Sequence, residues 1–190
     1  MDNPILLDFP YSFDTERLTI RGPLPGDAAR IREAVIESHD ELIPWMPWAV
    51  EVASEREYEI RVREGRLKFL ARTDMWMMLL LKGTEIMVGS SGMHRIDWSV
   101  PKFEIGYWVR TPYAGQGYIT EAVLGITTCA FDTLGAQRLE IRCDVKNTRS
   151  AAVAHRAGYT HEGTLRRDAR DHHGQLRDTY IFARLRGENS

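Results

Sequence analysis

The stretch from residue 102 to residue 130 constrains the fold of this chain more than any other. It begins with apolar residues that alternate with polar or small ones, as in a β-strand: Phe103, Ile105, Tyr107 and Val109. After a short glycine-rich segment, apolar residues recur every three or four positions, as along one face of a helix: Ile119, Ala122, Val123, Ile126 and Ala130. A strand, a tight turn and an amphipathic helix are therefore predicted in that order.

The turn contains Gly115 and Gly117 and favours an anion-binding site. Glycines before a helix let the backbone approach a ligand closely, and the first helical N–H groups point outward with the positive end of the helix dipole. A phosphate is the expected anion. The glycine spacing matches neither the Rossmann dinucleotide-binding fingerprint nor the Walker A loop of nucleotide-binding proteins. The alternative to an anion site is therefore a strand-to-helix turn that merely needs two residues with positive φ angles. Glu104 and Trp108, on one face of the preceding strand, favour a site.

Composition and charge describe an ordinary globular chain. Its 190 residues, 43% hydrophobic and 27% charged, are expected to form one domain. The net charge of −2 gives no electrostatic footprint for nucleic acid. Cys129 and Cys143 lack the spacing of a zinc site or a disulfide framework, and no metal is indicated. The N-terminus has no basic signal region and no apolar run reaches membrane-spanning length, so we expect a cytoplasmic protein with no membrane or nucleic-acid partner.

The remaining pattern predicts an α+β (mixed α/β) domain. Strands are expected near 17–24, 75–82, 85–97, 102–110, 137–146, 159–168 and 177–185, and helices near 27–39, 54–72, 117–134 and 148–157. A helix between the strands at 102–110 and 137–146 predicts a parallel βαβ crossover. Residues 1–14 are expected to form an arm that packs on the body or on a second subunit, and residues 15–186 a single domain. A homodimer remains an open alternative.

Seven motifs follow one another between about residue 13 and residue 185. They are Thr15-Glu-Arg-Leu18, Pro44-Trp-Met-Pro-Trp-Ala49, Gly92-Met-His-Arg-Ile-Asp97, Glu104-Ile-Gly-Tyr-Trp108, Gly115-Gln-Gly-Tyr-Ile-Thr-Glu-Ala122, Asn147-x-x-Ser150 and Gly158-Tyr-x-x-Glu-Gly163. This ordered set resembles the GNAT N-acetyltransferase superfamily, and within it the ribosomal-protein N-terminal acetyltransferase (Rim-type) branch. The resemblance implies a central, twisted, mostly antiparallel sheet with flanking helices, and acetyl-CoA as the cosubstrate.

The resemblance also implies how acetyl-CoA is held. The pyrophosphate would lie on the backbone amides of the turn, which are those of Ala114, Gly115, Gln116, Gly117, Tyr118 and Ile119. The pantetheine arm would run like an extra strand beside Trp108 and Val109. Asn147 would hold the acetyl-pantetheine end, with Ser150 near the thioester.

Three positions depart from the family pattern. Ala114 replaces a basic or glutamine residue that usually opens the turn, and Ile119 replaces a small residue at its end. Ala154 stands where other branches place a tyrosine that protonates the leaving thiolate. Ser150 is therefore the candidate for that proton transfer, with solvent as the alternative.

Glu104 is the candidate base that removes a proton from the amine. Apolar neighbours, among them Phe103, Ile105 and Trp108, are expected to desolvate its carboxylate and raise its pKa, which brings it closer to the range useful for proton transfer. An exposed strand glutamate paired with a Lys or Arg is the alternative. Cys143 falls on the inward phase of its strand and is expected to be inert core, which favours direct transfer in a ternary complex over an acetyl-cysteine.

The other candidates each have a structural alternative. Trp45 and Trp48, set between prolines, could line an acceptor groove or pack in the core. Asn147 could simply cap a helix, and Ser150 could be a small helical residue. No role is assigned to His94.

The expected activity is acetyl-CoA-dependent N-acetyl transfer to a primary amine. The branch that the chain resembles implies a protein N-terminal α-amine as acceptor. A small-molecule amine (an antibiotic, a polyamine or an amino acid) is one alternative, and an acyl-CoA-binding regulator without turnover is another. An unrelated nucleotide-binding module is the third.

Overall fold

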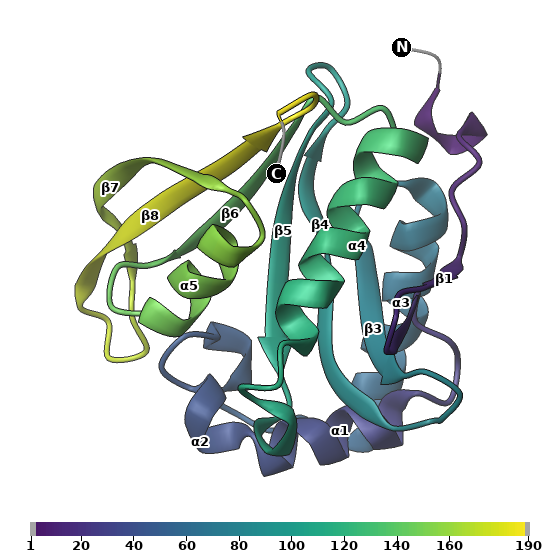
Figure 1. Ribbon diagram of the computed structural model, residues 1–190. Coiled ribbons are helices and arrows are strands. Elements are labelled where there is room, and N and C mark those ends of the chain that lie inside the picture. The colour runs from purple at the N-terminus through teal and green to yellow at the C-terminus, as the bar shows by residue number, and fades with distance from the viewer. Residues whose placement is uncertain (1–2, 189–190) are drawn as a thin grey trace.

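A single eight-stranded sheet forms the centre of the computed structural model, which describes residues 3–188 (Figure 1). The strands lie in the order β1-β2-β3-β4-β5-β6-β8-β7. Their bounds are β1 (Ser12–Asp14), β2 (Leu18–Arg21), β3 (Met75–Leu81), β4 (Met87–Asp97), β5 (Lys102–Val109), β6 (Arg138–Asp144), β7 (Thr160–Arg170) and β8 (Leu176–Leu185). The pair β5–β6 is parallel and the other pairs are antiparallel, so the predicted mixed sheet with a parallel crossover is confirmed.

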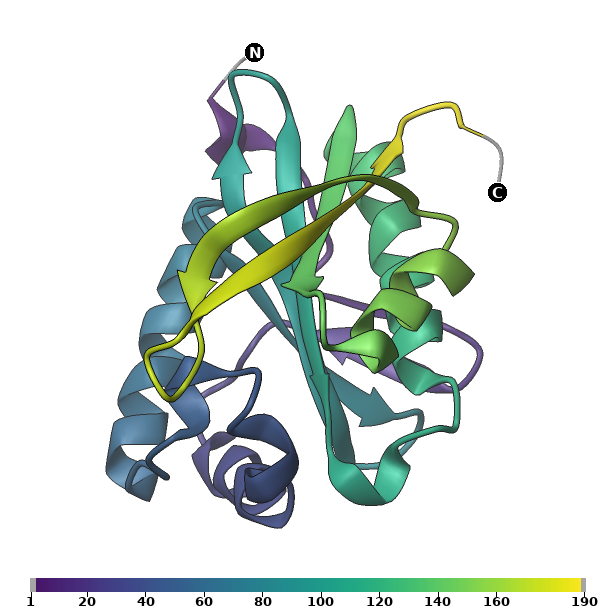
Figure 2. The ribbon, with the colours of Figure 1, turned by 90° about the vertical axis from the view of Figure 1, so that its left-hand side faces the viewer.

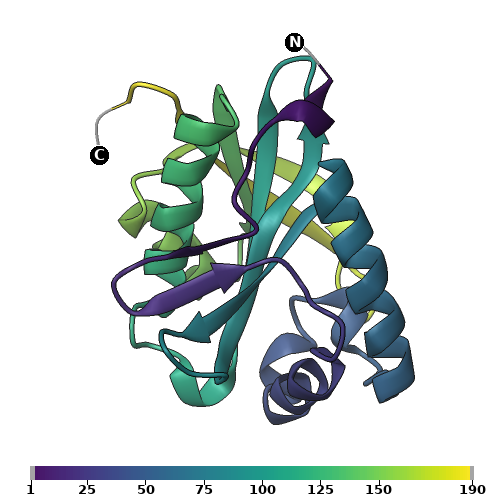
Figure 3. The same cartoon turned by 90° about the vertical axis from the view of Figure 1, so that its right-hand side faces the viewer.

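Helices cover both faces of the sheet. They are α1 (Ala28–Glu37), α2 (His39–Leu42), α3 (Glu55–Ala71), α4 (Tyr118–Thr133) and α5 (Thr148–Arg156), with short 3₁₀ turns η1 (Pro4–Leu6), η2 (Pro47–Ala49) and η3 (Thr111–Tyr113). Figure 2 shows α4 and α5 on one side of the sheet and α1 and α3 on the other, and Figure 3 shows the sheet edge between α4 and α3. The segment 41–49 is irregular between α2 and η2, as its two prolines predict.

The helix boundaries follow local capping chemistry. Ser54 and Glu57 form a capping box at the start of α3. Arg72 ends that helix in the left-handed conformation, with a φ of 60°. Asn147 caps α5, whose end at Arg156 is followed by Gly158 with a φ of 77°. These caps explain why the helices expected from the sequence lie close to their predicted positions.

The central strands are buried on both faces, which gives β3 its unbroken apolar sequence. Met75, Met77 and Leu79 pack in the larger core beneath α4. Met78 and Leu80 project to the other face and pack in a second core with α1 and α3. The sheet is therefore a rigid platform, and side chains on opposite faces of one strand enter different environments.

The N-terminal arm ends in a strand that the sequence pattern did not predict. β1 pairs with β2 at the sheet edge, and Phe9 just before it is buried against Phe69 at a ring distance of 6.0 Å. Ile5 and Leu6 remain exposed. Three residues are too few to show the alternation by which a strand is recognised.

β5 and β6 pair only along their first residues. The register joins Lys102 to Arg138, Phe103 to Leu139 and Glu104 to Glu140, and no later residues of the two strands pair. β5 continues to Val109 and stays paired with β4 on its other side. Figure 1 shows the two strands separating downward from this short contact. Beyond Glu104, one edge of β5 therefore has no strand partner in the described chain.

Candidate active site

Glu104 lies where β5 and β6 begin to separate. Its side chain is 18% exposed, and Oε2 accepts a hydrogen bond from Nη1 of Arg95 at 2.9 Å. Arg95 follows His94 on β4, at a bulge, and has a φ of 46°. The alternative to a catalytic Glu104 was an exposed strand glutamate paired with a Lys or Arg. The structure has the arginine partner, but the carboxylate is mostly buried.

Burial raises the pKa of the Glu104 carboxyl group above its ordinary value. The positive charges of Arg95 and Arg142 oppose this shift, and the neighbouring Glu140 adds to it. The direction is the one expected for a base that must accept a proton near neutral pH.

The cause of this desolvation is only partly the one inferred from the sequence. Phe103 and Ile105 are fully buried in the core beneath α4. Since successive side chains of a strand point to opposite faces, they do not cover Glu104. Trp108, four residues along, shares the Glu104 face and packs with the second core. That prediction was wrong for Phe103 and Ile105, because both direct neighbours of a strand residue belong to the other face.

A pair of hydroxyl groups lies on the opposite face of β5. The Tyr107 hydroxyl donates to the carbonyl oxygen of Ser150 at 3.0 Å and lies 3.1 Å from Ser150 Oγ. Asn147 Oδ1 accepts a hydrogen bond from the Ser150 N–H at 3.0 Å, so Asn147 is the N-cap of α5. Burial raises the pKa of both Tyr107 and Cys143, which keeps both groups protonated at neutral pH. Cys143 is 7% exposed, in agreement with the predicted core position.

The glycine turn has the predicted backbone conformation. Gly115 and Gly117 have φ angles of 76° and 84°, in the left-handed region, and Gly117 is the N-cap of α4. Amides in the first helical turn, including those of Tyr118 and Ile119, have no intrahelical acceptor. The Ala114 amide donates to the Thr111 carbonyl at 3.1 Å, so it is already engaged.

Side chains around the turn fix its position. Arg17 Nη1 donates to the Gln116 carbonyl at 3.0 Å, and Arg17 Nε donates to Glu121 Oε2 at 2.6 Å. Thr15 Oγ1 donates to the other carboxylate oxygen at 2.6 Å. Although burial acts to raise it, these hydrogen bonds hold the pKa of Glu121 below its ordinary value. No local sequence pattern predicts this contact, because residues 17 and 121 are far apart in the chain.

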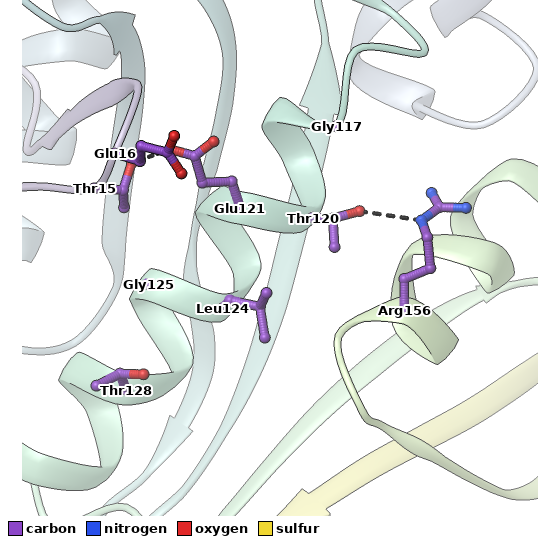
Figure 4. A pocket seen from close by; sticks show the side chains of 9 residues that line it. All are labelled: Thr15, Glu16, Gly117, Thr120, Glu121, Leu124, Gly125, Thr128 and Arg156. Atoms are coloured by element: carbon purple, nitrogen blue, oxygen red, sulfur yellow. Dashed lines mark hydrogen bonds between the residues drawn. The ribbon is translucent and has the colours of Figure 1, made fainter. Parts of the chain in front are cut away.

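A shallow hollow runs along the outer side of α4 from the glycine turn (Figure 4). Arg156, from the end of α5, donates through Nε to Thr120 Oγ1 at 3.4 Å. The hollow does not contain Glu104 or Ser150, so it is separate from the place where β5 and β6 diverge. Arg156 is thus a second cation, besides Arg17, close to the start of α4.

Two tryptophans, Trp48 and Trp108, lie together on the Glu104 side of the sheet. Trp48 is 40% exposed and its ring centroid is 5.9 Å from that of Trp108, whose side chain is half-buried. Trp45 is half-buried. Val109, at the end of β5, pairs with Gly89 of β4. Trp48 and Trp108 thus form an aromatic surface near the end of β5, while Trp45 is not among their ring partners.

Residues 3–188 contain neither a metal-binding cluster nor a membrane-spanning helix. No cluster of three or more His, Cys, Asp and Glu side chains in this part of the chain is arranged to hold a metal ion. Over the same residues, no helix is long and apolar enough to cross a membrane.

Comparison with known proteins identifies the family. Residues 17–160 match the family described as "Acetyltransferase (GNAT) domain". The chain is 32% identical over 174 residues to a Bacillus subtilis (strain 168) protein named "Putative ribosomal N-acetyltransferase YdaF", with 91% of this chain and 93% of that protein covered.

Solved structures share the fold. RimL, described as a ribosomal L7/L12 alpha-N-protein acetyltransferase in complex with coenzyme A, superimposes with a TM-score of 0.84 at 22% identity, over 93% of this chain and 97% of that one. The microcin C7 self-immunity acetyltransferase MccE, in complex with acetyl-CoA and AMP, gives a TM-score of 0.83 at 22% identity, over 90% of this chain and 93% of that one.

This chain belongs to the GNAT acetyltransferase family. It is an acetyl-CoA-dependent N-acetyltransferase, as the ordered motifs of its sequence predicted. The regulator without turnover and the unrelated nucleotide-binding module are thereby set aside.

Proposed function

We propose that this enzyme transfers the acetyl group to the N-terminal α-amine of a protein. The observation that carries the proposal is a largely buried carboxylate, that of Glu104, where β5 and β6 separate. The similarity to a protein named as a ribosomal N-acetyltransferase supports the same class of acceptor.

Acetyl-CoA fits the groups that the separated strands leave unpaired. The amides of Gly115 to Ile119 are the donors for the pyrophosphate, with Arg17 and Arg156 as nearby cations. The free edge of β5 up to Val109 can pair with the amide groups of the pantetheine arm, as an added strand would. When bound, acetyl-CoA supplies a thioester whose acetyl group is open to attack by an amine.

Glu104 is the proposed base that takes the proton from the incoming ammonium group. Burial raises the pKa of its carboxyl group, so the carboxylate is a better base than an exposed glutamate. Holding the amine beside the thioester turns a bimolecular reaction into a local one, which is the larger part of the expected acceleration. Ser150, with its hydroxyl beside that of Tyr107, is the candidate donor to the leaving thiolate on the other face.

Proton energetics favour an α-amine over a lysine. An α-amino group with a pKa near 7.8 is about one-seventh neutral at pH 7, whereas a lysine near 10.4 is neutral only about once in 2,500. The base must therefore supply roughly 3.5 kcal/mol less for an α-amine. Glu104 is held in an ion pair with Arg95, which makes its carboxylate a weaker base than burial alone would. Such a base suits deprotonation of an α-amine better than deprotonation of a lysine.

The aromatic surface of Trp48 and Trp108 is the candidate wall for the acceptor. Trp48 is exposed at the surface while Trp108 is anchored in the second core, so the pair combines an accessible face with a fixed position. An extended peptide end can pack against such a surface. A flat small-molecule amine can do the same, and it is the competing acceptor.

The test offers the enzyme matched acceptors. One peptide has a free N-terminus and no lysine, a second has the same sequence with a blocked N-terminus and one lysine, and a set of polyamines and amino acids forms the third group. Mass spectrometry should find acetylation of the free N-terminus above the other two. Modification confined to lysine or to the small amines would contradict the proposal, and thiol release from acetyl-CoA in each case would show that the enzyme was active.

A further inference from the structure

A histidine–aspartate pair lies on the same face of the sheet as Glu104. His94 of β4 is directly opposite Glu104 of β5 in the antiparallel register. Opposite residues of such a pair project to the same face with Cβ atoms about 5 Å apart. The His94 Nδ1 atom lies 2.8 Å from Oδ2 of Asp74, the residue just before β3.

This contact fixes the orientation of the imidazole ring. A carboxylate oxygen only accepts hydrogen bonds, so Nδ1 of a neutral ring carries the hydrogen and Nε2 is left as an acceptor. Within residues 3–188, Nε2 has no hydrogen-bond partner. The side chains of His94 and Asp74 are each 33% exposed, so the pair also reaches solvent.

Two glycines make room for the ring across the two strands. A Cβ atom at Gly106 would lie 3.1 Å from Cδ2 and 3.4 Å from Nε2 of His94. A Cβ atom at Gly92 would lie 3.2 Å from Nε2. The ring therefore lies over Gly92 of β4 and over Gly106, which is between Glu104 and Trp108 on β5.

Charged groups from each neighbouring strand lie near the His94–Asp74 pair. Asp74 precedes β3, Arg95 follows His94 on β4, and Glu104 lies on β5. Glu140 and Arg142 of β6 act on the Glu104 carboxylate from the other side, and a charge on His94 also acts on it. A proton that arrives on Glu104 can therefore be moved toward a group that a second carboxylate stabilises.

We propose that His94, held by Asp74, receives the acceptor's proton from Glu104 and passes it to solvent. This inference rests on the proposed role of Glu104 as the base. His94 is thus a relay residue that resets the base after each turnover.

The ammonium group of the acceptor loses one proton to the Glu104 carboxylate, and its lone pair forms the new bond to the acetyl carbon while the carbon–sulfur bond breaks. The nitrogen loses a second proton as it becomes the amide, and the leaving thiolate gains one proton and departs as the thiol. The proton on Glu104 is therefore the net proton released in each turnover. Glu104 then gives that proton, through a water molecule, to Nε2 of His94, which becomes an imidazolium stabilised by Asp74. Release of one proton from the ring to bulk solvent returns both side chains to their starting state.

The alternative is a structural role, in which His94 and Asp74 only tie β3 to β4. Both roles predict that changing His94 weakens the enzyme. Only a relay predicts that a dissolved base can replace the ring, because a small buffer molecule can accept the proton but cannot restore a hydrogen bond within the protein.

The experiment measures kcat as a function of imidazole concentration at fixed pH and ionic strength. His94→Gln and His94→Ala should lower kcat about tenfold or more, up to the roughly 10²-fold at the lower end of the usual contribution of a positioned acid–base group, and leave the KM for acetyl-CoA unchanged. Imidazole should raise kcat of His94→Ala toward the wild-type value, while the wild type should not respond. Asp74→Asn should lower kcat less than the His94 variants do, because the His94 imidazole ring remains in place. His172→Gln, in the exposed β7–β8 turn, is the matched control and should behave as the wild type.

Two results would overturn the relay. One is an unchanged kcat in both His94 variants. The other is a loss of kcat that imidazole does not restore in variants that still bind acetyl-CoA, which would assign His94 a structural role. His94→Gln preserves most of the side-chain volume, so it remains informative if His94→Ala fails to fold. The assay uses whichever amine the wild type acetylates fastest, so a wrong acceptor class contradicts the proposed function without affecting this comparison.

Discussion

Glu104 and Glu140 are the last pair of residues that join the parallel strands β5 and β6. The free edge of β5 begins directly after Glu104, so one residue marks both the proposed base and the start of the proposed pantetheine path. Because the strand has two faces, Glu104 and the Tyr107–Ser150 hydroxyl pair lie on opposite sides of this path. In this arrangement the proposed removal of the acceptor's proton and the proposed protonation of the thiolate take place on opposite sides of β5.

Gly117→Ala should weaken acetyl-CoA binding at least tenfold, which corresponds to about 1.4 kcal/mol. Gly117 has a φ of 84°, and an added Cβ would lie 3.3 Å from Nη2 of Arg17, so both the turn and the neighbouring cation must shift. Titration calorimetry with acetyl-CoA measures the change. Gly174→Ala is the control, because it has the same backbone strain at a φ of 77° with open space around it in the β7–β8 turn. Equal affinities for the two variants would move the phosphate site away from the turn.

Ser150→Ala should reduce kcat by no more than about 30-fold. A thiol with a pKa near 8.5 is only ~1.5 units above neutral pH, so protonation of the thiolate is worth roughly 2 kcal/mol at most. Steady-state kinetics with saturating acetyl-CoA give the value, and Thr148→Ala removes an exposed hydroxyl from the same helical turn as a control. A larger loss with intact acetyl-CoA binding would mean that Ser150 does more than donate this proton.

Arg95→Gln should move the acidic limb of the kcat/KM profile to higher pH. The guanidinium group lowers the pKa of Glu104, so its loss leaves the pKa higher and the carboxylate protonated over more of the pH range. A protonated carboxyl group cannot act as the base, and the rate therefore falls at a higher pH than in the wild type. Arg63→Gln removes an equally exposed arginine from an ion pair on α3 and should leave the profile in place. A shift to lower pH in Arg95→Gln would contradict the assignment.

Much of the fold could be predicted from the sequence, because its elements carry strong local patterns. The alternation of β5, the two glycines before α4 and the capping residue Ser54 each report on nearby backbone alone. The strand β1 was missed because it has three residues and is fixed by pairing with β2 rather than by periodicity.

The site was predictable only in part, since several of its contacts depend on register and packing. Arg17 meets Glu121 from 104 positions away, and Asp74 meets His94 from 20 positions away. The separation of β5 from β6 depends on where their pairing stops, which neither strand's own sequence specifies. For this reason the sequence could predict candidate site residues such as Glu104. It could not predict the side chains that contact and position them.

Glu104→Gln should not destabilise the protein through loss of its charge. For an acid whose pKa is raised by folding, the stability that it contributes declines as the pH rises from its ordinary pKa through the raised one. Above that window the native state contains an unfavourable buried charge, and glutamine removes it. Thermal unfolding at neutral and mildly acidic pH checks this, with a variant-to-wild-type difference that grows more favourable as the pH rises.

The most direct test of the central claim is the single-turnover rate of acetyl transfer by Glu104→Gln across the pH range. The amide cannot accept a proton, so the rate with saturating acetyl-CoA should fall by about 10²-fold or more and lose the acidic limb of the wild-type profile. Glu140→Gln, the partner across the β5–β6 pair, should retain most of its rate and keep that limb. A Glu104→Gln enzyme that transfers acetyl groups at the wild-type rate, with the acidic limb preserved, would show that Glu104 is not the base.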